Sequence, residues 1–210
     1  LNPDIIMALK IIDFLSLFAG TVFFYLWMKA ETKKDIPALG GALLYLYAPY
    51  RFSLIFVRGS PEFLAYAILP AVLYFYVLFF NSEGKKSIFF AFLASLTGAF
   101  LAISHNFTVM FVFPLILAYL FVKSILLKID LKKIQWLAFS FVASFGMSSF
   151  FIGPALLEKK FTRIGENFLF WKEHFPTLGQ LVRSPWGYFY SSLGTRDDGM
   201  SFMLGYAHWI

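Results

Sequence analysis

The sequence predicts an all-α protein that crosses a membrane about six times and then begins a seventh span. Of its 210 residues, 60% are hydrophobic and only 14% are charged, too few to cover a water-soluble globule of this size. The apolar residues gather in runs of about 20, the length of a helix that crosses a bilayer. The 29 Phe and 11 Tyr suit side chains that face lipid and its interface.

The predicted spans follow one another with short polar loops between them. The first covers residues 5–28 and ends in the loop KAETKKD. The second, 36–48, is short for a hydrocarbon core about 30 Å thick, and the sequence leaves open whether it tilts or continues past a kink at Pro49. Further spans are predicted at 61–80, 88–103, 107–127 and 134–157. Residues 1–157 would therefore form a transmembrane domain, 158–201 an extracytoplasmic loop segment, and 202–210 the start of another span.

Basic residues are unevenly distributed between the two sides of these spans. If successive spans alternate in direction, one side carries nine lysines and the short connections of the other carry only Arg51 and Arg58. Loops rich in Lys usually remain in the cytoplasm, so we expect a multi-pass protein of the cell membrane with its lysine-rich loops inside. This bias explains the net charge of +6 without a nucleic-acid partner, and it requires that 36–48 crosses.

The ends of the chain and its lack of cysteine set two further limits. The chain begins with Leu1 and stops within the apolar run FMLGYAHWI, so we expect a fragment of a longer protein. With no cysteine, it forms neither disulfides nor thiolate metal sites.

The stretch RGSPEF places Arg58 and Glu62 between two apolar runs. One interpretation is a helix start, with Ser60 as the cap, Pro61 in the first turn and Glu62 near the positive end of the helix dipole. The other is an anion site, because an arginine beside a helix N-terminus suits a phosphate or pyrophosphate, and Glu62 could orient Arg58. The sequence favours neither.

Two more polar stretches are expected on the same, extracytoplasmic side. In SHN, His105 and Asn106 would lie level with Arg58 and Glu62; a boundary or capping role is the plainer interpretation and a site is the alternative. In SPWGYFYSSLGTRDDGMSF, aromatic rings and carboxylates suit a carbohydrate. The pair Asp197-Asp198 would accept a divalent cation but does not require one, and a DDG turn at the interface explains it equally well.

At these residues the chain resembles a family of large bacterial and archaeal membrane proteins, those with the 6-pyruvoyl-tetrahydropterin synthase-related membrane domain. The resemblance runs from about Ile36 to the end and is carried by R-G-x-x-E, S-H-N, S-P-W-G-Y and D-G-M-S-F. Nothing in the sequence supports the zinc chemistry of a soluble pterin synthase. The family is similar to the GT-C glycosyltransferases, which take a sugar from a polyprenyl-phosphate carrier.

This resemblance implies a GT-C-like helical bundle and a glycosyltransferase that uses a lipid-linked sugar donor outside the cytoplasm. Its catalytic acid would lie upstream of Leu1, and no cofactor or metal is required. The residues expected to bind substrate are Arg51, Arg58, Glu62, His105, Asn106, Trp186, Tyr188 and Asp198. Alternatives are a transporter or flippase of a lipid-linked or anionic solute, which would use the same arginines, and a non-catalytic membrane protein.

Overall fold

The computed structural model describes residues 3–53, 55, 62–162, 175–185 and 201–209. It confirms an all-helical chain, with no strand in these ranges. The α-helices are α1 (Pro3–Thr32), α2 (Asp35–Leu46), α3 (Pro49–Ser53), α4 (Glu62–Phe80), α5 (Gly84–Ser104), α6 (Asn106–Leu126), α7 (Leu131–Leu157) and α8 (Leu178–Val182). Two 3-10 turns, η2 (Lys159–Phe161) and η4 (Tyr206–His208), follow α7 and precede the C-terminus.

Five of the helices are long and apolar enough to cross a membrane, namely α1, α4, α5, α6 and α7. The predicted span at 36–48 corresponds to α2, which has 12 residues and is therefore only about 18 Å long. Pro49 begins the separate helix α3 instead of continuing α2. A sixth crossing at α2 therefore stays a prediction. So does a seventh, because the described residues 201–209 form no α-helix and contain the 3-10 turn η4.

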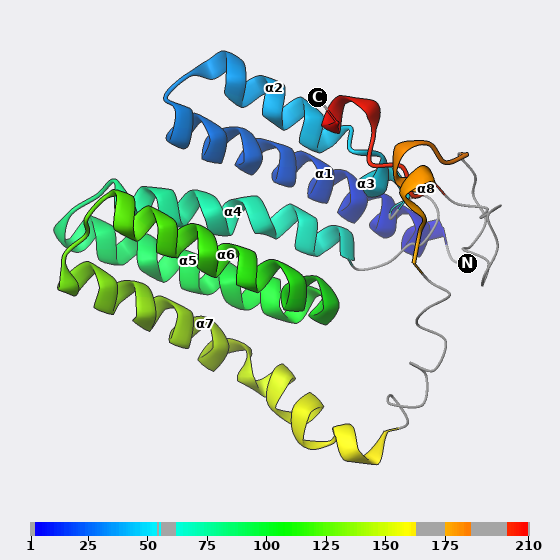
Figure 1. The fold of residues 1–210 in the computed structure, drawn as a ribbon. Coiled ribbons are helices and arrows are strands. Elements are labelled where there is room, and N and C mark those ends of the chain that lie inside the picture. The colour runs from blue at the N-terminus through cyan, green and yellow to red at the C-terminus, as the bar shows by residue number, and fades with distance from the viewer. Residues whose placement is uncertain (1–2, 54, 56–61, 163–174, 186–200, 210) are drawn as a thin grey trace.

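The helices run back and forth between two ends of the bundle (Figure 1). We call one end the His105 end: α4 and α6 begin there, α5 and α7 end there, and α2 leads back to it through α3. The opposite, lysine end holds the turns between α1 and α2, α4 and α5, and α6 and α7. The sequence-based expectation that Glu62 and His105 share one end is therefore confirmed.

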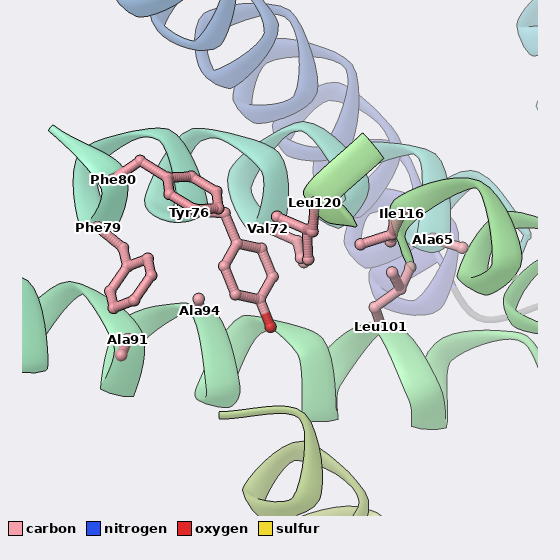
Figure 2. Close-up of a cluster of buried hydrophobic side chains, with 10 residues drawn as sticks. All are labelled: Ala65, Val72, Tyr76, Phe79, Phe80, Ala91, Ala94, Leu101, Ile116 and Leu120. Atoms are coloured by element: carbon pink, nitrogen blue, oxygen red, sulfur yellow. The ribbon is translucent and has the colours of Figure 1, made fainter. Parts of the chain in front are cut away.

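The core lies around α4, which packs against α1 on one side and α5 on the other. Figure 2 shows Val72, Tyr76 and Phe79 of α4 facing α5, where Ala91, Ala94 and Leu101 meet them. Small alanines on α5 let the aromatic rings of α4 approach closely, as is usual between helices in a membrane. The outward faces of α1, α6 and α7 keep many large apolar side chains exposed, which suits contact with lipid.

A seam of small residues joins α5 to α7. Ser140, Ser144 and Ser148, four residues apart on α7, are all buried. The hydroxyl of Ser144 donates to the carbonyl of Ser95 at 3.0 Å, and that of Ser140 lies 3.1 Å from the Tyr76 hydroxyl. The small side chains let the backbones of α5 and α7 lie close together. The serine hydroxyls form their hydrogen bonds with neighbouring helices inside the bundle, where water does not supply them.

Ion pairs and hydrogen bonds stabilise the lysine end of the bundle. Glu31 of α1 accepts hydrogen bonds from Lys123 and Tyr119 of α6. Lys29 lies 2.7 Å from Asp35, and this hydrogen bond holds the pKa of Asp35 below its ordinary value. Lys133 reaches back from α7 to Glu83 and to the carbonyl of Phe80. These contacts join each lysine-rich turn to a neighbouring helix.

Candidate functional site

The clearest polar arrangement at the His105 end is a pair between Glu62 and His105. His105 Nε2 lies 3.4 Å from Glu62 Oε1, and the two side chains are 17% and 16% exposed. Glu62 is the first residue of α4, and His105 separates α5 from α6, so the pair joins three helices. Sequence reasoning predicted that these side chains approach each other, and this distance confirms it. Whether they bind a substrate stays a prediction.

The local backbone fixes the orientation of the His105 ring. His105 is extended (φ −160°, ψ 109°) and caps α6, with Nδ1 accepting from the backbone N–H of Thr108 at 3.2 Å. A backbone N–H can only donate, so Nδ1 carries no proton in this arrangement and the proton of a neutral ring lies on Nε2. On that side of the ring, Nε2 lies 3.4 Å from Glu62 Oε1. The imidazole is therefore both a helix cap and a carboxylate partner.

Tyr50 of α3 adds a third group to the pair. Its hydroxyl lies 3.5 Å from Glu62 Oε2, and its ring meets Tyr66 edge-on with centroids 5.9 Å apart. The Glu62 carboxylate thus faces His105 with one oxygen and Tyr50 with the other. Sequence reasoning missed Tyr50, although its place in YAPYRF, next to Arg51, offered a signal.

Arg51 lies deeper than the pair. It is 4% exposed, its Nη1 donates to the carbonyl of Tyr45 at 3.1 Å, and its guanidinium carbon lies 4.5 Å from the centroid of the Tyr45 ring. Burial lowers the pKa of Arg51. No carboxylate lies within ion-pair distance of it in the described part of the chain. The aromatic ring and the carbonyl are therefore what stabilise this buried cation.

A glycine on α1 makes room for the Arg51 side chain. A Cβ added at Gly20 would lie 3.2 Å from Arg51 Nη2 and 3.0 Å from the Cα of Ala67. The guanidinium thus occupies the junction of α1, α2 and α4. The structure does not bring Arg51 to the surface where a headgroup would arrive, so its part in substrate binding stays a prediction.

The other predicted substrate-binding residues are not placed by the structure. Arg58, Trp186, Tyr188 and Asp198 lie outside the described residues. Asn106 begins α6, but its side chain is not described. Within the described ranges, no three His, Asp or Glu side chains gather as metal ligands would.

A cavity of about 620 Å³ lies at the same end, between α2 and the C-terminal segment. Leu43 of α2 and Tyr47, which follows α2, line one side, and Tyr206 and His208 the other. The C-terminal segment is held there by hydrogen bonds from Leu204 N to Leu181 O and from Ser53 Oγ to Ser201 O. Segments far apart in sequence therefore meet at the His105 end.

Comparison with known proteins places the chain in a family. No curated protein and no solved structure matches it. A family model described as "6-pyruvoyl-tetrahydropterin synthase related domain; membrane protein" matches residues 1–176. The match contains R-G-x-x-E and S-H-N but ends before S-P-W-G-Y, and it includes the first helix, which the sequence resemblance did not. Because it covers most of the 210 residues, the chain belongs to the family of membrane proteins with this 6-pyruvoyl-tetrahydropterin synthase related domain.

Proposed function

We propose that the chain is part of an integral membrane protein that binds a polyprenyl-phosphate-linked sugar at its His105 end and, as in GT-C glycosyltransferases, takes part in sugar transfer. The observation that carries this proposal is the Glu62–His105 pair, held at 3.4 Å where three helices meet. Ionisable groups are costly inside a membrane protein, and those that are kept usually serve a substrate or an ion.

In this proposal the residues divide into three roles. Arg58 binds the carrier phosphate, since a guanidinium can offer two parallel hydrogen bonds. Glu62 and His105 position that headgroup, with Asn106 beside them. Trp186, Tyr188 and Asp198 contact the sugar, and a divalent metal there is compatible but not required. The His105 end faces the extracytoplasmic side, because the lysine-rich turns lie at the other end.

The geometry supports a revised role for Arg51. Its side chain is buried between α1, α2 and α4 and bonded to Tyr45. We infer that it fixes α3, and with it Tyr50, relative to the Glu62 carboxylate, and does not itself meet the phosphate. Its substitution should therefore lower the stability of the fold as well as ligand binding.

A transporter of an anionic solute is the second candidate, and the burial of Arg51 favours it. A cation without a carboxylate partner in the described part of the chain is what an anion pathway through a membrane uses. The two candidates differ in what they do with the ligand. A transporter moves it across the bilayer unchanged, whereas a transferase breaks its sugar–phosphate bond.

The test is binding of polyprenyl phosphate to the full-length protein in detergent, with Glu62→Gln and His105→Gln compared with Glu158→Gln. Glu158 is an exposed acid that follows α7 at the same end and lies outside the pair. We expect both site variants to lose about tenfold in affinity, the scale of one hydrogen bond to a charged group, and the control to bind as the parent does. Unchanged binding in both site variants would refute the proposal. Vesicle uptake of the lipid-linked sugar without cleavage would identify the transporter.

A further inference from the structure

A groove opens between α6 and α7 at the His105 end, with α5 behind it. Its volume is about 420 Å³. It is lined by Ala102, Val109, Met110, Phe113, Phe145, Ile152, Ala155, Leu156 and Lys159. Towards the middle of the bundle the groove ends at Phe113 and Phe145, whose ring centroids are 4.9 Å apart. Apolar side chains on three helices thus form a groove that faces the lipid.

Lys159 is the one charged residue among those that line the groove. It lies in η2, just beyond the end of α7, and is exposed. Its ammonium group makes no hydrogen bond or ion pair with the residues that the structure describes. The neighbouring Lys160, by contrast, lies over the ring of Phe161 at 5.0 Å and does not line the groove. A cation without an ion-pair partner in the described part of the chain therefore lies at the outer end of the apolar groove.

The length of the groove along α7 matches the thickness of one leaflet of a bilayer. Lys159 is the fourteenth residue after Phe145, and α7 accounts for twelve of these steps, so the two residues lie about 21 Å apart along this stretch. Half of a bilayer that is about 40–45 Å thick with its headgroups is of the same length. When Phe145 lies near the bilayer centre, Lys159 therefore lies at the level of the headgroup phosphates.

We propose that this groove binds an anionic phospholipid of the bilayer, with one acyl chain between α6 and α7 and the phosphate beside Lys159. The apolar lining accepts the chain, and the single free ammonium favours a headgroup of net charge −1 over a zwitterionic one, whose own ammonium would be repelled. Ala102 and Val109 lie three residues before and four after His105, so the lipid would flank the Glu62–His105 pair without being its substrate.

The test measures lipid contact at one point in the groove. The chain contains no cysteine, so Met110→Cys provides a single site for a fluorophore on an exposed lining residue. The labelled full chain is placed in phosphatidylcholine vesicles that contain increasing amounts of either brominated phosphatidylglycerol or brominated phosphatidylcholine, and each brominated lipid quenches the fluorophore on contact. We expect the parent to prefer phosphatidylglycerol about fivefold, the factor that one lysine contributes near an anionic surface.

Two pairs of variants separate the groove from general surface charge. Lys159→Gln should abolish the preference, whereas Lys160→Gln should keep it. Ala155→Phe, at an exposed position in the groove, should lower quenching by both lipids, whereas Val142→Phe, on the exposed face of α7 outside the groove, should not. Equal quenching by both lipids in the parent, or an unchanged preference in Lys159→Gln, would overturn the proposal. So would displacement of bromolipid by polyprenyl phosphate at lower concentration than by phosphatidylglycerol, which would assign the groove to the carrier.

Discussion

Replacing Gly98 with alanine tests the α5–α7 seam directly. A Cβ at Gly98 would lie 2.7 Å from Ser144 Oγ and 3.3 Å from Ser144 Cβ, so Ser144 must move. Its hydroxyl is held by a hydrogen bond of 3.0 Å to the carbonyl of Ser95. Overpacking of this kind costs about 1–3 kcal/mol, and the lost interhelical hydrogen bond costs about 0.6 kcal/mol. Alanine regains about 0.5–1 kcal/mol as a better helix former than glycine. Together these terms predict that Gly98→Ala lowers the free energy of unfolding by about 0.5–3 kcal/mol.

The assay is unfolding by sodium dodecyl sulfate in mixed micelles, followed by far-UV circular dichroism. Gly146→Ala on α7 is the matched control, because nothing lies within 4 Å of its added Cβ; it should be neutral or stabilising. Ser144→Gly removes both opposing atoms, so the double variant Gly98→Ala/Ser144→Gly should recover about 1 kcal/mol in a double-mutant cycle. If Gly98→Ala unfolds like the parent and the cycle shows no coupling, α5 and α7 do not pack as described.

Three further predictions address topology, the phosphate and the core. Single cysteines at Ser82 and Gly194 should differ with an impermeant reagent on intact cells: labelling at Gly194 only supports cytoplasmic lysine loops, and labelling at Ser82 only reverses the topology. Arg58→Lys in the full-length protein should weaken binding of polyprenyl phosphate by about 1.5–3 kcal/mol at matched expression, because an ammonium cannot form the two parallel hydrogen bonds of a guanidinium; unchanged binding would leave Arg58 as a boundary residue. Tyr76→Phe should lower the free energy of unfolding by about 0.6 kcal/mol, since its hydroxyl lies 3.1 Å from Ser140 Oγ; no loss in the detergent titration would show that this contact does not contribute.

Much of the fold could be predicted from the sequence, because membrane spans depend on composition. A run of about 20 apolar residues must satisfy its own backbone hydrogen bonds in lipid, and only a helix does so within one segment. That rule predicts α1, α4, α5, α6 and α7 without any knowledge of their neighbours. It fails at α2, because 12 residues are too few for composition to distinguish a crossing from a shorter helix that returns the chain.

The candidate site was predicted in part, and the reason lies in distance along the chain. Glu62 and His105 could be paired from topology alone, since both stand at helix ends on one side. The place of Tyr50 next to Arg51 offered a signal, but its contact with Glu62 could not be predicted, because it depends on how α3 turns after Pro49. Nor could the burial of Arg51, since a basic residue in a short connection usually faces water or headgroups.

The sequence by itself determined that the chain is a helical membrane protein, which five segments are long and apolar enough to cross, and which helix ends lie together, because hydropathy and charge act locally on each segment. Only the tertiary structure decided which side chains meet at those ends. It places His105 Nε2 near Glu62 while Nδ1 caps α6, encloses Arg51 beside Gly20 and Tyr45, and leaves Lys159 without an ion-pair partner among the described residues at the mouth of a groove. Each of these three arrangements needs side chains from several helices to meet at one depth in the bundle. Packing between the helices sets that depth, and the hydropathy pattern within a single helix does not.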